Sequence, residues 1–140
     1  MSKKSAKIAA LIEAQQGQEL DAHYLGFFEC FNRQLFYEAH DVLEELWLAQ
    51  GKSGPNYAFF KGLIQLAGAF VHLQKNRLKP AVALFNLAEA NLRQYPNPHE
   101  RLEVVRVLEL ISDWRGRVEA GGFAANPLPL HPSPQLQLIR

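Results

Sequence analysis

The segment from Asn56 to Asn76 constrains the fold more than any other part of the chain, because it is apolar on nearly every side of a helix. A helix of this kind is normally central, with other helices packed around it. Gly62 and Gly68 would let neighbouring backbones approach it closely, despite the low helix propensity of glycine. The apolar residues that carry this pattern are Phe59, Phe60, Leu63, Ile64, Leu66, Ala67, Phe70, Val71 and Leu73.

Helical spacing of apolar residues continues through the rest of the chain, and no segment sustains the two-residue alternation of a strand. The sequence therefore predicts an all-α fold, a compact multihelical array of about five helices. A short helix over about 5–16 is expected to precede them. The others are expected from Asp21 to about 31, over 36–49, over 56–76, over 80–95 and from about 97 to 120.

The last of these helices has a clear start signal. Asn97 can cap a helix, Pro98 suits the first helical position, and Glu100 can complete a capping box. After it come Pro127, Pro129, Pro132 and Pro134. We predict one helical domain over 1–125 and an extended, proline-rich tail over 126–140, either mobile or packed across the bundle.

Composition limits the class of protein. A chain of 140 residues with 48% hydrophobic content suits a single soluble domain. Its formal net charge of +1 gives no field for a polyanion, so nucleic acid is not an expected partner. No segment approaches the ~20 apolar residues of a membrane span. Together with the single cysteine, Cys30, these features predict a cytoplasmic protein without a membrane partner.

Two polar side chains interrupt the apolar face of the helix expected over 36–49. At about 100° per residue, His40 and Glu44 share a stripe with Phe36, Leu43 and Trp47. A histidine and a carboxylate one turn apart on such a face need a partner in the core or a ligand. Trp47 itself is expected to pack in the core.

The central helix carries one matching polar line. Lys61, Gln65, Gly68 and His72 are spaced four, three and four residues apart, which places them on one face. If this line meets the stripe of the preceding helix, polar side chains gather around Gly68. The predicted polar cluster comprises His40, Glu44, Trp47, Lys61, Gln65 and His72.

Three interpretations of this cluster remain open. In the first, Glu44 accepts from His40 or His72 and Gln65 completes a hydrogen-bond network that fixes helix register, which avoids about 1–3 kcal/mol for each unsatisfied group. They can instead line a pocket for a small anionic or polar ligand, with Lys61 and His40 as donors. In the third interpretation, His40, Glu44 and His72 hold a divalent metal with an open position for hydrolysis.

At these residues the chain resembles the bacterial family called domain of unknown function 309. The resemblance spans about 21–95. It rests on two blocks, Phe36-Tyr37-Glu38-Ala39-His40-Asp41-Val42-Leu43-Glu44-Glu45-Leu46-Trp47 and Phe60-Lys61-Gly62-Leu63-Ile64-Gln65-Leu66-Ala67, the second followed by His72. Gln34 and Lys79-Pro80 depart from glycines that the family has in turns. The resemblance implies a multihelical fold and marks His40, Glu44, Trp47, Gln65 and His72 as motif positions, and the family name assigns no activity.

The sequence thus favours a binding or interaction module with a semi-buried polar cluster and no cofactor. The alternative is a metal-dependent hydrolase that uses His40, Glu44 and His72 with a divalent metal. A homo-oligomer is a further hypothesis, with the aromatic-rich region from Tyr24 to Phe36 as the contact. The sequence names no other partner.

Overall fold

A computed structural model describes residues 20–139. This part of the chain is helical, and apart from two isolated bridges it contains no strand. The predicted all-α fold is confirmed, while the helix expected over 5–16 lies outside the described residues. The helices are α2 (Ala22–Asn32), α3 (Phe36–Gln50), α4 (Tyr57–Gln74), α5 (Leu78–Leu92), α6 (Val104–Ala120) and the short 3-10 helix η1 (Leu128–Leu130).

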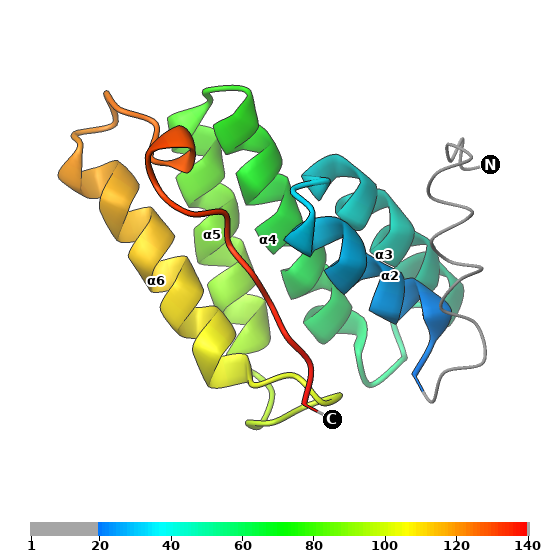
Figure 1. Ribbon diagram of the computed structural model, residues 1–140. Coiled ribbons are helices and arrows are strands. Elements are labelled where there is room, and N and C mark those ends of the chain that lie inside the picture. Colours follow the sequence, from blue (N-terminus) through cyan, green and yellow to red (C-terminus); the bar gives the residue numbers. More distant parts are fainter. Residues whose placement is uncertain (1–19, 140) are drawn as a thin grey trace.

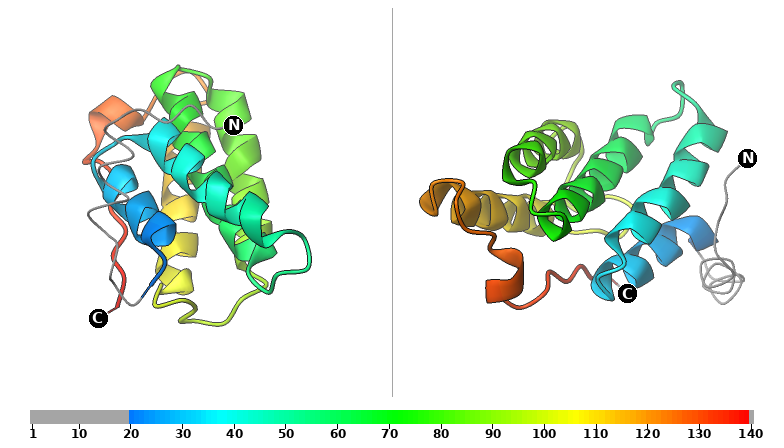
Figure 2. Two further views of the ribbon diagram at one scale, coloured as in Figure 1. Left: turned by 90° about the vertical axis from the view of Figure 1, so that its right-hand side faces the viewer. Right: turned by 90° about the horizontal axis from the view of Figure 1, so that it is seen from above.

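The helices form an array in which each packs mainly on the next one along the chain (Figures 1 and 2). The central helix of the sequence prediction is α4, which lies between α3 and α5. Phe70 of α4 is the aromatic hub of the core, with its ring centroid 5.0–5.6 Å from four other rings. These rings come from α2, α3, α5 and α6, and belong to Phe31, Phe36, Phe85 and Trp114.

The aromatic-rich region proposed for self-association is part of this core. Its ring residues are at most 5% exposed, and they pack on one another and on α4. The region therefore presents no exposed aromatic face for such a contact, and a homo-oligomer stays a prediction. The residues concerned are Tyr24, Phe27, Phe28, Phe31 and Phe36.

The turn between α2 and α3 explains one departure from the family pattern. Gln34 has a φ of 62°, in the left-handed region, where an L side chain is disfavoured and glycine is not. Its backbone carbonyl accepts a hydrogen bond from the Gln74 side chain, 3.2 Å away. The chain keeps the turn geometry that suits glycine although it has a glutamine there.

Gln34→Gly should therefore raise the free energy of unfolding by about 0.5–1 kcal/mol, because relief of the left-handed strain exceeds the added freedom of glycine in the unfolded chain. Chemical denaturation measures the change. Arg33→Gly is the matched control: Arg33 is also exposed but has an ordinary φ of −95°, so the same change should destabilise. Equal effects of the two substitutions would contradict this explanation.

The last helix begins later than predicted. The capping box at Asn97 and Glu100 is wrong, because Glu100 and Arg101 both have left-handed φ values, 48° and 59°, which no right-handed helix accommodates. A turn closed by hydrogen bonds between His99 and Leu102 precedes the helix instead. Asn97 still serves α6, since its side-chain oxygen accepts from the Val105 N–H at 3.3 Å.

The proline-rich tail packs on the domain, which settles the alternative left open by the sequence. It runs extended between α6 and α2 in Figure 1. Asn126 donates to the Leu73 carbonyl at the end of α4. Further along, Leu136 is only 5% exposed and joins the hydrophobic core. The tail is thus a structural part of the domain.

Candidate functional site

A pocket of about 250 Å³ lies between α3, α4 and α5. Gly68 of α4 lines it opposite Leu84 of α5, whose Cδ1 atom would lie 3.0 Å from a Cβ added at the glycine. Most of the exposed wall is apolar, and the polar groups come from two histidines and a glutamine. The lining residues are Tyr37, His40, Ile64, Gln65, Gly68, Val71, His72 and Leu84.

His40 presents its ring to the pocket from α3. Its Nδ1 atom is buried and has no hydrogen-bond partner among the described residues. Its Nε2 atom is 3.7 Å from a carboxylate oxygen of Glu44, one turn further along the helix, which is too far for a hydrogen bond. The ring of Tyr37 stacks on it at a centroid distance of 6.1 Å. The histidine is therefore held in place by stacking while one ring nitrogen remains unsatisfied.

His72 lines the same pocket from α4, and its Nδ1 atom is also buried without a partner in the described structure. Burial lowers the pKa of His72 below that of a free histidine, and the positive charges of Arg77 and Lys75 lower it further. The ring is therefore neutral at pH 7. In the neutral ring, one nitrogen donates and the other accepts a hydrogen bond, so His72 suits a polar but uncharged group.

Gln65 is fixed from the neighbouring helix rather than by a histidine. Asn91 of α5 donates to its side-chain oxygen at 2.7 Å. This bond leaves the amide N–H groups of Gln65 free to donate. In the first interpretation, Glu44 accepts from His40 or His72 and Gln65 completes the network. The described residues do not form it, because His40 Nε2 is 3.7 Å from Glu44 and the Gln65 oxygen is bonded by Asn91.

The predicted polar cluster is divided into two groups. His40, Gln65 and His72 meet at the pocket, whereas Glu44, Trp47 and Lys61 do not line it. Lys61 lies over the Tyr57 ring at 5.8 Å, and Trp47 packs 5.1 Å from the same ring. The division follows from helix geometry: Lys61 and His72 share a face but are separated by about 16 Å along α4. Trp47 is half-buried against the core, as expected.

The three proposed metal ligands also fail to gather. His40 and Glu44 are neighbours on α3, but no group of three His, Cys, Asp or Glu side chains within residues 20–139 is placed to hold one ion. Their geometry therefore lends no support to a metal-assisted reaction at His40, Glu44 and His72.

Sequence reasoning missed the apolar walls of the pocket. Tyr37 lies three residues before His40 and so shares its face, a signal that was available in the spacing. Leu84 belongs to α5, and its contribution depends on how α5 packs against α4. The hydrogen bond from Asn91 to Gln65 was not predictable either, because nothing in the sequence around Asn91 indicates it.

Part of this chain matches a known protein family. A family model described as domain of unknown function (DUF309) matches residues 24–84. The resemblance to DUF309 is confirmed. Every residue that lines the pocket falls within this DUF309 match, from Tyr37 to Leu84. Neither the curated proteins nor the solved structures contain a match to the chain.

The lowered pKa of His72 predicts a pH dependence of stability. Between the folded pKa and the value of about 6.5 in the unfolded chain, the unfolded state binds the proton and the folded state does not. Stability contributed by neutral His72 is therefore present above pH ~6.5 and is lost as the pH falls towards the folded pKa. An NMR titration of the ring should give a midpoint below that of a free histidine.

Arg77→Gln should raise this midpoint, because it removes one of the two nearby positive charges. Lys52→Gln is the control, since Lys52 carries the same charge in the loop before the opposite end of α4 and should leave the midpoint unchanged. A His72 midpoint at or above the free value would show that the ring is not buried as described.

Proposed function

We propose that the chain is a binding module, and that the pocket between α3, α4 and α5 holds a small neutral molecule with an apolar body and one hydroxyl or amide group. One observation carries the proposal: two histidines that line the same mainly apolar pocket each have a buried Nδ1 atom with no hydrogen-bond partner within residues 20–139. Leaving such a group unsatisfied costs about 1–3 kcal/mol. A ligand that displaced the atoms covering these nitrogens and bonded to them would offset this cost.

The lining favours a neutral ligand over an anionic one. Lys61, the donor expected from the sequence, lies over Tyr57 and outside the pocket. His72 is neutral at pH 7 because burial and nearby cations lower its pKa. The walls supplied by Ile64, Val71 and Leu84 match an apolar body, while the neutral imidazole can donate to or accept from a hydroxyl or amide.

Three probes test this chemistry: phenol, benzyl alcohol and benzamide, each an aromatic ring with one neutral polar group. At ten times its Kd, a probe that binds the folded state should stabilise the protein by about 1.4 kcal/mol. Benzoate, which has a similar shape and a negative charge, should stabilise less. Thermal and chemical unfolding at pH 7.5 measure the effect.

Gly68→Leu should block the pocket, because the introduced leucine side chain enters the space beside Leu84. Gly116→Leu makes the same change on α6, where an added Cβ meets nothing within 4 Å. We expect probe stabilisation to disappear in the Gly68 variant and to persist in the Gly116 variant. Failure of all three probes, or an undiminished response of the Gly68 variant, would overturn the proposal.

The alternative metal-dependent hydrolase is not what the site favours, because its three ligands are not gathered. None of the helices in the described part of the chain is long and apolar enough to cross a membrane. Cytoplasmic location and the absence of a nucleic-acid partner stay predictions from composition.

A further inference from the structure

The C-terminal tail is held through its backbone, as a strand would be. The side-chain amide of Asn32, the last residue of α2, donates to the Leu136 carbonyl and accepts from the Leu136 N–H, both at 2.7 Å. The Asn32 carbonyl also accepts from the Gln135 side chain at 2.9 Å. One residue of α2 thus satisfies both backbone groups of Leu136, as a neighbouring strand would do.

A second anchor lies at the other end of the same strand. The Ile139 N–H donates to the Arg101 carbonyl, and Arg101 Nε donates to the Ile139 carbonyl, both at 2.7 Å. Leu138 pairs with Leu102 in an isolated antiparallel bridge. Residues 135–139 are therefore recognised at both ends by groups that any extended chain can satisfy.

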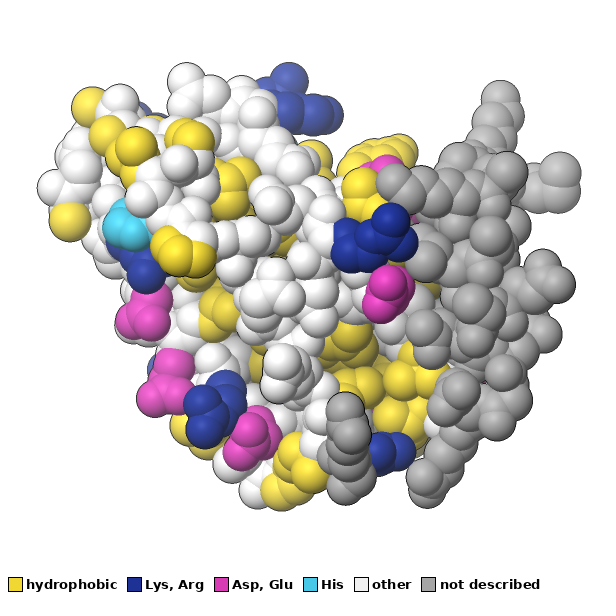
Figure 3. Space-filling model, viewed as in Figure 1, with side chains coloured by type: hydrophobic (Ala, Val, Ile, Leu, Met, Phe, Trp, Pro, Cys, Tyr) yellow, Lys and Arg dark blue, Asp and Glu magenta, His cyan; other side chains and the backbone are white. Residues whose placement is uncertain are grey.

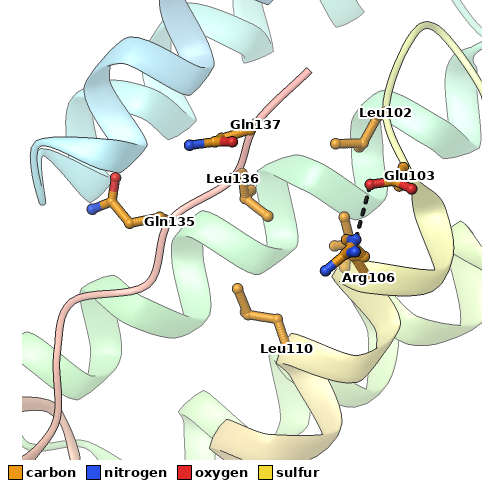
Figure 4. Close-up of a pocket in the computed structure, with 8 residues that line it drawn as sticks. Leu102, Glu103, Arg106, Leu110, Gln135, Leu136 and Gln137 are labelled. Atoms are coloured by element: carbon orange, nitrogen blue, oxygen red, sulfur yellow. Dashed lines mark ion pairs between the residues drawn. The ribbon is translucent and has the colours of Figure 1, made fainter. Parts of the chain in front are cut away.

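Side chains alternate along this strand. Leu136 is buried and Leu138 half-buried, while Gln135, Gln137 and Ile139 are exposed. Figure 4 shows Leu136 on the opposite side of the tail from Gln135 and Gln137. Leu136 adjoins a cavity of about 410 Å³ that is lined by the tail, by the start of α6 and by the two residues before α6, so the tail fills its groove incompletely. The groove selects an uncharged strand with leucine at alternate positions.

We propose that this groove also accepts the tail of a second copy of the chain, so that two molecules exchange residues 135–139 and form a dimer. The strand that demonstrably fits is the chain's own, and all its anchoring contacts are available to a second copy. Among the described helices, the last is η1, which ends at Leu130, so none of them includes residues 135–139.

The segment before the strand supports a second copy as the occupant. Leu130, just before the short connection 131–133, is 70% exposed, and Phe123 is 36% exposed. Figure 3 shows hydrophobic side chains gathered on the surface over this end of the molecule. A second copy packed on this end of the molecule would cover these apolar side chains. Exchange is a low-cost route to a dimer because it reuses contacts that the monomer already makes.

In the intact chain the tail competes from within the same molecule, where a short linker gives an effective concentration in the mM range. Two variants remove this competition. Asn32→Ala has a weakened groove and an intact tail, whereas Leu136→Asp has an intact groove and a tail that cannot enter it. When the two are mixed, the tail of the Asn32→Ala variant can enter the groove of the Leu136→Asp variant, because no other tail competes for that groove.

Size-exclusion chromatography with light scattering should show each variant alone as a monomer. The mixture should give a one-to-one species of twice the 15.9 kDa mass of the chain. Helical circular dichroism of each variant verifies folding. A mixture of two folded variants that stays monomeric would overturn the proposal, and so would a dimer formed equally well by Leu136→Asp alone.

Hydrogen exchange on the unmodified protein provides a test that does not depend on variants. Exchange between molecules requires the tail to open while the domain stays folded. The amide hydrogens of Leu136 and Ile139 should therefore exchange roughly ten-fold or more faster than that of Phe70 in α4, which opens only with the whole domain. Equal protection of all three amides would show that the tail is released only by global unfolding and would contradict the proposal.

Discussion

Phe70→Ala should lower the free energy of unfolding by about 3–5 kcal/mol, the largest effect expected from a single substitution in this chain. Phe70 is fully buried in α4, and its ring contacts rings from four other helices. Truncation removes the buried ring and leaves a cavity that the surrounding helices cannot all close. The loss is comparable to much of the stability of a typical domain, about 5–15 kcal/mol.

Chemical denaturation monitored by helical circular dichroism measures this loss. Leu48→Ala is the control, because Leu48 is 66% exposed on α3 and its truncation should change stability by less than about 0.5 kcal/mol. A Phe70→Ala variant as stable as the Leu48 variant would show that the five helices do not share one core.

Gly62→Ala should destabilise by about 1–3 kcal/mol, although alanine is the better helix former by about 1 kcal/mol. A Cβ atom at this position would lie 2.9 Å from Leu92 Cγ and 3.2 Å from Asn91 Cβ. Both neighbours belong to α5, so the added methyl group pushes α4 and α5 apart. Because Asn91 also holds Gln65, the substitution should weaken probe binding in the pocket as well.

Gly116→Ala is the control that measures the gain in helix propensity alone. An added Cβ there meets nothing within 4 Å, so this variant should gain up to about 1 kcal/mol. The two substitutions are chemically identical and lie within helices, and they are expected to differ in sign. If both stabilise, α4 and α5 are not packed as closely as the structure shows.

The order and type of the helices were predictable because the hydrophobic pattern is strong. Because α4 is apolar on nearly every side, other helices must pack around it, and α3 and α5 do so. The predicted start of α6 failed because Asn97 signals a cap without specifying which amide it serves. Its side chain caps Val105 across a turn, a distance along the chain that no capping rule contains.

The candidate site was predictable only in part. Spacing correctly placed Gln65, Gly68 and His72 on one face of α4 and directed His40 towards it. Lys61 shares that face but lies about one turn before Gln65 and outside the pocket, so its assignment required its position along the helix axis as well as its direction. Leu84 enters from α5, a contact that depends on how α5 packs against α4.

The match to DUF309 and the geometry of the pocket lead to the same residues. The match covers residues 24–84, and the pocket is lined wholly from within it, whereas the tail and α6 lie outside it. Binding at the pocket and exchange of the tail therefore rest on separate parts of the chain. Failure of one proposal leaves the other intact.

NMR of the histidine rings during titration with phenol is the most direct test of the binding site. The chain has five histidines, and only His40 and His72 line the pocket. We expect their ring resonances to shift and saturate together, while those of His23, His99 and His131 stay constant. Unchanged His40 and His72 resonances, or equal shifts of all five, would contradict a binding pocket between α3, α4 and α5.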